Sequence, residues 1–109
     1  MKIRNERQLE MDIKNAKNPR EKALAYYNLG LFHDNNSREI KAIPNYLKAL
    51  DYGLNKNLKS MALAWLASSF YKTGRSKEAL KRANESKKIA NVKLKKFLIG
   101  LERRIQKSF

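Results

Sequence analysis

The residue types that most often perform chemistry are scarce in this chain. Its single histidine, His33, is followed by Asp34 and Asn35, and such side chains can move a proton or bind a metal ion. A metal site would need a second histidine or a cysteine, and the chain has neither. We therefore expect His33 to be a packed or hydrogen-bonded residue near a helix end. No Gly-rich phosphate loop follows a strand pattern and no serine has a positioned base, so we expect no catalytic residue, no metal and no cofactor.

The chain's only tryptophan is a candidate for recognition chemistry instead. Trp65 lies one position outside an apolar stripe formed by Leu63, Leu66 and Phe70. An exposed Trp65 would offer a surface for stacking or for anchoring a peptide. A Trp65 packed under the C-terminal helix would instead stabilise the domain by about 2–3 kcal/mol. The sequence leaves both alternatives open.

Basic residues are the third distinctive set. The net charge is +15, and residues 75–109 hold 12 Lys or Arg against 3 Glu. Nine of these cations form a candidate basic patch: Lys81, Arg82, Lys87, Lys88, Lys93, Lys95, Lys96, Arg103 and Arg104. Such runs are usually the solvated surface of a helix, but they could also bind phosphates. The total charge favours nucleic-acid binding, and the absence of a recognised nucleic-acid module disfavours it.

Composition limits the class of protein. A chain of 109 residues with 42% apolar residues predicts one globular domain with a modest core, and its charges interrupt every stretch that could span a membrane. The absence of cysteine fits a reducing compartment, and the N-terminus lacks the apolar core of a secretory signal. We therefore expect a cytoplasmic protein without a membrane segment, as a monomer or a homodimer.

Helical periodicity and capping residues predict about six helices. Leu9, Ile13 and Ala16 recur at helical spacing in the first, which is expected over 4–17. Asn18 and Pro19 are expected to start the second. The predicted caps of the next two helices are Asn36 or Ser37, and then Asn57. The last two helices are expected to begin near Ser76 and Val92, and Leu94, Leu98, Leu101 and Ile105 form the apolar stripe of the final one.

Two stretches share one plan, each with two helices folded back on each other: 23–49 and 60–86. Their small and large apolar residues lie at the offsets of the tetratricopeptide repeat, namely Tyr26, Leu29, Gly30, Ala42, Tyr46 and Ala49, then Leu63, Leu66, Ala67, Phe70, Gly74 and Ala79. The chain therefore resembles that family. It departs from the family pattern at His33, Leu54, Ala83 and Ser86, where Tyr, Pro, an aromatic and Ala are usual.

The resemblance implies an all-α, antiparallel array of helical hairpins that forms a short right-handed superhelix. We expect one domain over 1–109, with a leading half-repeat helix at 4–17, repeats at 19–56 and 57–91, and a solvating C-terminal helix at 92–107. The family generally binds peptides or protein helices in a concave groove. Carried over by offset, the groove residues are Tyr27, Asn28, Leu31, Met61, Trp65, Ser68, Tyr71, Lys96, Ile99 and Arg103. The expected ligand is an acidic or amphipathic peptide, and nucleic acid bound by the basic C-terminal face is the alternative.

Overall fold

The computed structural model describes residues 4–109. Over this range six α-helices make up 80% of the chain and no strand is present, as the predicted all-α class requires. The chain divides into two compact units, the first ending at Leu54 and the second running from Asn55 to Phe109. Adjacent helices contact each other within each unit, so the predicted array of helical hairpins is confirmed.

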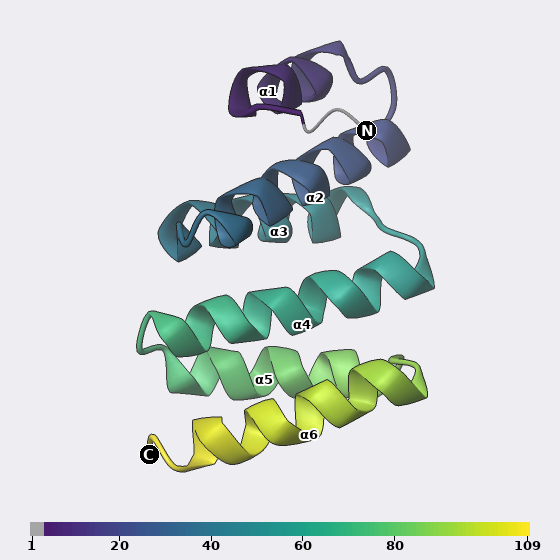
Figure 1. Ribbon diagram of the computed structural model, residues 1–109. Helices are drawn as coiled ribbons and strands as arrows, with labels where there is room; N and C mark the ends of the chain where they lie inside the picture. Colours follow the sequence, from purple (N-terminus) through teal and green to yellow (C-terminus); the bar gives the residue numbers. More distant parts are fainter. Residues whose placement is uncertain (1–3) are drawn as a thin grey trace. The chain divides into compact units, whose positions relative to one another are not determined.

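The first unit contains α1 (Glu6–Asn15), α2 (Pro19–Asn35) and α3 (Glu39–Tyr52). Helices α2 and α3 form an antiparallel hairpin, and α1 packs against α2 (Figure 1). The Asn18 side chain accepts the Glu21 N–H at 2.8 Å and Pro19 occupies the first helical position, as expected.

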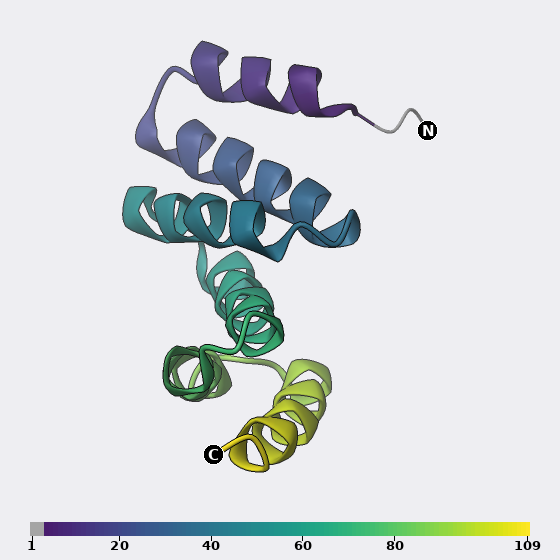
Figure 2. The ribbon, with the colours of Figure 1, turned by 90° about the vertical axis from the view of Figure 1, so that its left-hand side faces the viewer.

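The second unit contains α4 (Lys56–Lys72), α5 (Ser76–Lys87) and α6 (Val92–Gln106). Figure 2 shows these three helices nearly end-on, with α5 beside both α4 and α6. Ala79 and Ala83 on α5 are fully buried, and their small side chains let the neighbouring helices approach closely. Leu98, Leu101 and Ile105 are also buried, which confirms the apolar stripe predicted for α6.

The turns of both hairpins contain the same backbone hydrogen bond. The Arg38 N–H donates to the His33 carbonyl at 2.8 Å, and the Arg75 N–H donates to the Phe70 carbonyl at 2.8 Å. Each bond closes the last turn of a helix, and it requires a residue with positive φ just before the arginine. In the second hairpin this residue is Gly74, with φ 80°, and in the first hairpin the corresponding residue is a serine with φ 57°.

Two of the predicted caps are wrong. Neither Asn36 nor Ser37 caps α3, because both belong to the turn that ends α2, and α3 begins after Arg38 without a side-chain cap. Asn55 rather than Asn57 caps α4, where its side chain accepts the Leu58 N–H at 2.9 Å. The two asparagines are equally suitable by type, and the helix begins at the earlier one.

Two buried polar groups of the hairpins have specific partners. In the first unit, the Tyr46 hydroxyl donates to Asp34 Oδ2 at 2.9 Å. Burial raises the pKa of Tyr46 far above its usual range, and the neighbouring Asp34 carboxylate adds to this shift. In the second unit, the fully buried Ser86 hydroxyl donates to the Ser60 carbonyl at 2.7 Å, joining α5 to α4.

Candidate functional site

An aromatic pair joins the first and last helices of the second unit. The rings of Trp65 on α4 and Phe97 on α6 meet edge to face, with centroids 5.4 Å apart and an interplanar angle of 66°. Trp65 is half-buried and Phe97 is 36% exposed. Trp65 therefore combines the two alternatives left by the sequence, because it packs against the C-terminal helix and still presents part of its ring to solvent.

This pair forms one wall of a pocket of about 420 Å³. The lining residues come from α4 and from the first two turns of α6, and they are Met61, Trp65, Asn91, Lys93, Leu94 and Phe97. The volume is in the range of pockets that hold a small ligand or a side chain of a partner. Its walls are largely apolar and aromatic, with an amide and an ammonium at one end, which suits an apolar group next to a negative one.

Local structure explains why the polar residues lie at that end. Asn91 caps α6, and its side-chain oxygen accepts the Leu94 N–H at 2.8 Å. The positive end of the α6 dipole therefore lies at the pocket, next to the Lys93 ammonium. No acidic residue lies in the first turn of α6 or in the pocket lining. The electrostatic potential here favours a negatively charged group.

The second unit is strongly basic as a whole. Residues 55–109 contain fifteen Lys or Arg and three Glu, a net charge of +12 out of the +15 of the chain. Each of the three glutamates is already paired, Glu78 with Arg75 at 3.2 Å, Glu85 with Arg82 at 3.2 Å, and Glu102 with Lys87 at 2.8 Å. The positive charge of this unit is therefore not neutralised by its own carboxylates.

The structure brings together only some of the residues predicted for the groove. Met61 and Trp65 line the pocket, whereas Ser68 and Tyr71 are half-buried on α4 and lie outside its lining. The predicted α6 residues Lys96, Ile99 and Arg103 are exposed and do not line it either. Ile99 and Arg103 line a separate depression beside α5, together with Lys87, Glu102 and Gln106.

Sequence reasoning missed Asn91, Leu94 and Phe97, and it placed Lys93 only in the basic patch. The signal that could have found Phe97 is its position beside Leu98 in the apolar stripe of α6. Residues that flank a buried stripe face the neighbouring helices, and residues opposite the stripe face solvent. Lys96, Ile99 and Arg103 lie opposite the stripe, which explains their exposure.

In the first unit, the position of Tyr27 corrects the prediction. Tyr27 is 3% exposed and its ring packs against that of Tyr46, with centroids 6.1 Å apart. It is therefore a core residue and cannot offer a surface for a ligand. Asn28 and Leu31 are half-buried, and Asn28 lines a shallow pocket of about 290 Å³ between α1 and α2.

The predicted basic patch is mostly exposed. Lys81, Lys88, Lys93, Lys95, Lys96, Arg103 and Arg104 are all exposed. The remaining two, Arg82 and Lys87, are half-buried and belong to the ion pairs with Glu85 and Glu102. Seven cations of the patch are thus accessible to a ligand.

His33 is buried at the end of α2, with 4% of its surface exposed and its ring edge-on to Phe32 at 5.6 Å. Burial lowers the pKa of His33 below 6.5. Its Nδ1 has no hydrogen-bond partner among residues 4–109. Over the same range, no three His, Cys, Asp or Glu side chains are grouped as they would be to bind a metal ion. None of the helices in the described part of the chain is long and apolar enough to span a membrane.

Comparisons with known proteins identify the family. None of the curated proteins matches the chain. A family model described as "Tetratrico peptide repeat" matches residues 23–102, from the first turns of α2 to the last turns of α6. The match covers most of the chain, and it includes both hairpins and the pocket between α4 and α6. The chain belongs to the tetratricopeptide repeat family.

Proposed function

We propose that this protein binds a short acidic or amphipathic peptide segment of a partner protein at the pocket between α4 and α6. Membership of the tetratricopeptide repeat family suggests a protein–protein interaction module, and that family is generally non-enzymatic. The pocket between α4 and α6 is the proposed binding site of this module, and an acidic or amphipathic peptide is the proposed ligand.

The aromatic pair of Trp65 and Phe97 carries the proposal. Tryptophan is enriched among the residues that dominate the binding energy of protein interfaces, and aromatic side chains in general bury a large apolar area there. Phe97 is 36% exposed, so a ligand side chain that covers it removes apolar surface from water. The pocket volume of about 420 Å³ fits such a side chain better than it fits a large cofactor.

Charge supports a negatively charged peptide. Lys93 lies in the pocket lining and the N-terminus of α6 points to the same end. The unit also carries a net charge of +12, which accelerates the approach of an acidic segment over distances of about 8–10 Å.

The same charge favours a second candidate function, which is binding of nucleic acid by the exposed cations of α5 and α6. This alternative does not use the aromatic pair, because phosphate contacts need exposed cations only. It therefore predicts a different set of sensitive residues and a steeper fall of affinity with salt concentration.

A display library of random short peptides provides the direct test. The peptides that the wild-type protein enriches are synthesised, and their affinities are measured by fluorescence anisotropy for the wild type, Phe97→Ala and Phe109→Ala. Phe109 is a matched control, because it is a 65% exposed phenylalanine of the same unit that does not line the pocket. Loss of an anchoring aromatic should cost about 2 kcal/mol or more, which is at least about thirtyfold in affinity.

Two results would overturn the proposal. One is that no peptide is enriched over a column without the protein. The other is that Phe97→Ala and Phe109→Ala bind the selected peptides equally well. The Trp65 emission gives an independent readout, because Trp65 is the only tryptophan of the chain and lines the pocket.

A further inference from the structure

The pocket contacts define how α4 and α6 align. Both helices run in the same direction (Figure 1), and the pocket places Met61 near Lys93 while Trp65 meets Phe97. Residues three or four positions apart lie on one face of a helix. One turn further along, Ser68 on α4 therefore lies level with Gly100 on α6.

The surface at this next level is open. Ser68 has a short, half-buried side chain, and Gly100 has none. A Cβ atom added to Gly100 would meet no atom within 4 Å. The surface over Gly100 is therefore open, and a ligand held in the pocket can extend across it without meeting a side chain of Gly100.

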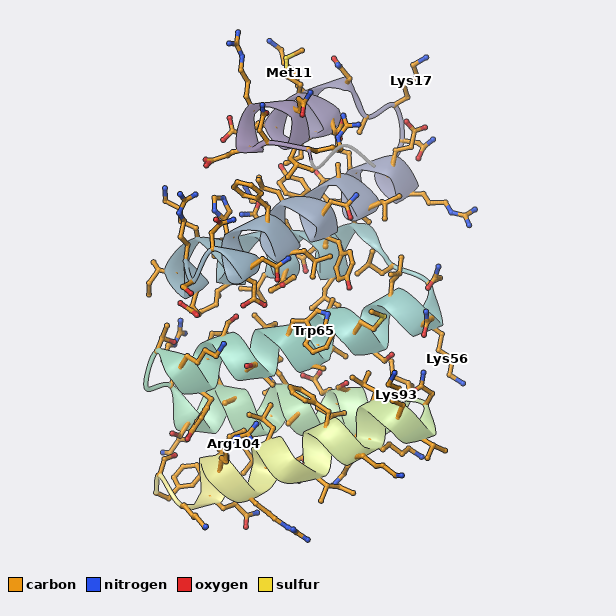
Figure 3. All side chains as sticks on the ribbon, viewed as in Figure 1. Met11, Lys17, Lys56, Trp65, Lys93 and Arg104 are labelled. Carbon is orange, nitrogen blue, oxygen red and sulfur yellow. The ribbon has the colours of Figure 1, made fainter. Side chains whose placement is uncertain are left out.

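Cations stand on both sides of this open surface. Lys93 lines the pocket end, and Arg104 lies one turn beyond Gly100 on the same face of α6. Figure 3 shows Lys93 and Arg104 on opposite sides of Trp65. Both are exposed, and no ion pair joins either of them to a carboxylate within the described residues. Their charges are available to a ligand.

The distance between these cations corresponds to a definite length of peptide. Lys93 and Arg104 are eleven positions apart on α6, and a rise of about 1.5 Å per residue separates their Cα atoms by about 16 Å along the axis. An extended peptide advances about 3.3 Å per residue, so about five residues span this interval. The pocket lies near the Lys93 end.

We propose that the ligand is an extended peptide with two acidic side chains about five residues apart, one paired with Lys93 and the other with Arg104. An apolar side chain between them, nearer the acid at the Lys93 end, enters the pocket beside Trp65 and Phe97. This inference rests on the proposed function, because it specifies the ligand of the same pocket. It requires in addition that the open surface over Gly100 is part of the binding surface.

The peptides enriched from the display library give the first test. Aligned on their apolar residue, they should carry acidic residues on both sides at this spacing. The most enriched peptide is then synthesised again with its two acids moved next to each other, at unchanged composition and charge. The rearranged peptide should bind more weakly, by about 1.5–5-fold for the ion pair that it loses.

Variants of the protein give the second test. The double variant Lys93→Gln/Arg104→Gln should bind the original peptide more weakly. It should also bind the original and the rearranged peptide with equal affinity. The control is Lys95→Gln with Lys81→Gln, which removes the same charge from two exposed lysines outside the pocket lining and should still bind the original peptide more tightly than the rearranged one. Gly100→Leu should place a side chain in the path of the peptide and weaken binding more than tenfold, without loss of stability, since a Cβ there meets nothing.

The outcomes separate this inference from the proposed function. If the selected peptides depend on Phe97 but carry no paired acids, or if the rearranged peptide and the Gly100→Leu variant bind normally, the inference is wrong and the pocket remains the binding site. If no peptide is enriched at all, the inference fails together with the proposed function. Enrichment of paired acids with sensitivity to Lys93, Arg104 and Gly100 supports both.

Discussion

Gly30 on α2 touches the ring of Tyr46 on α3 so closely that a Cβ atom on the glycine would come within 2.8 Å of ring atoms Cδ1 and Cε1. The ring cannot move aside easily, because Tyr46 is fully buried and its hydroxyl is held by Asp34. The first hairpin is therefore closed by a contact between backbone and aromatic ring that only glycine permits. Gly30 is one of the residues by which the chain resembles its family, and this contact gives that position a physical reason.

The first prediction compares two glycines. Gly30→Ala should destabilise the protein by about 1–2 kcal/mol, because overpacking of a core costs about 1–3 kcal/mol and exceeds the gain of up to about 1 kcal/mol in helix propensity. Gly100→Ala should stabilise it by about 0.5–1 kcal/mol, because the same propensity gain meets no obstacle. Urea unfolding followed by circular dichroism measures both. Equal shifts in the same direction for the two variants would contradict the close contact at Gly30.

The second prediction concerns two buried serines of the second hairpin. Ser86→Ala removes the 2.7 Å bond to the Ser60 carbonyl and should cost about 0.5–1.5 kcal/mol, although alanine is the usual residue of the family at this position. Ser69 is equally buried, but its hydroxyl has no hydrogen-bond partner within residues 4–109. Ser69→Ala should therefore leave the stability unchanged or raise it slightly. Thermal unfolding of the two variants side by side measures the difference, and a more damaging Ser69→Ala would show that the hydroxyl assignments are wrong.

The features that could be predicted from the sequence are those marked by residue types at fixed spacing. The two hairpins were predictable, because Gly30 and Ala42 in one and Ala67 and Ala79 in the other mark the close approaches between helices, and small residues at fixed spacing are visible in a sequence. The cap of α4 was not, because Asn55 and Asn57 are chemically equivalent and only packing of the whole helix decides between them.

The candidate site, like the cap of α4, was only partly predictable from the sequence. The offset from the family placed Lys96, Ile99 and Arg103 in the groove, but the small residue of α6, Gly100, marks no close approach to a neighbouring helix that would have fixed the register of α6. The structure turns these three residues to solvent and brings Phe97 against Trp65. The prediction that Tyr27 lies in the groove is wrong for a related reason, since its position on α2 does not reveal that Tyr46 packs against it. Contacts between residues on different helices decide both cases.

The third prediction is a dependence of stability on pH that originates at His33. Burial lowers the pKa of His33, and Lys41 and Arg38 on the side of α3 lower it further, whereas Glu6 and Glu10 on α1 oppose the shift. The unfolded chain, with the ordinary pKa of 6.5, then binds a proton more readily than the folded one. The contribution of neutral His33 to stability is present above pH 6.5 and is lost as the pH falls below that value towards the lower pKa of the folded state.

The measurement is urea unfolding at a series of pH values from about 7.5 to 5, for the wild type and His33→Tyr. As the pH falls, the wild type should lose unfolding free energy by at most about 1.4 kcal/mol per pH unit through His33. The variant should not show this loss, because it has no histidine to titrate. Tyr is the usual residue of the family here and does not titrate in this range. Comparing slopes rather than absolute stabilities removes the effect of the substitution itself. Identical slopes for the two proteins would exclude His33 as the origin.

The fourth prediction separates peptide binding from nucleic-acid binding by their response to salt. A peptide held by an aromatic pocket and two exposed ion pairs depends mainly on desolvated apolar contacts. Its affinity should therefore fall less than about tenfold between 50 and 200 mM salt, since exposed ion pairs are worth only about 0.2–1 kcal/mol each. A nucleic acid that contacts six to ten phosphates releases counterions and should lose about 10³–10⁵ in affinity over the same range.

The sensitive residues should also differ between the two ligands. For a peptide, Trp65→Ala with Phe97→Ala should abolish binding, while Lys81→Glu with Lys88→Glu, two exposed cations outside the pocket lining, should mainly slow association. For a nucleic acid, the charge reversals should abolish binding and the aromatic variant should retain it, because phosphates require cations rather than apolar walls. The assay uses nuclease-treated protein with labelled RNA, labelled duplex DNA and a selected peptide as parallel probes, with binding followed by anisotropy. One outcome would contradict both candidate functions: RNA or DNA stays bound at 200 mM salt and to the charge-reversal variant, and no peptide binds. Neither the aromatic pocket nor the exposed cations could then account for the interaction.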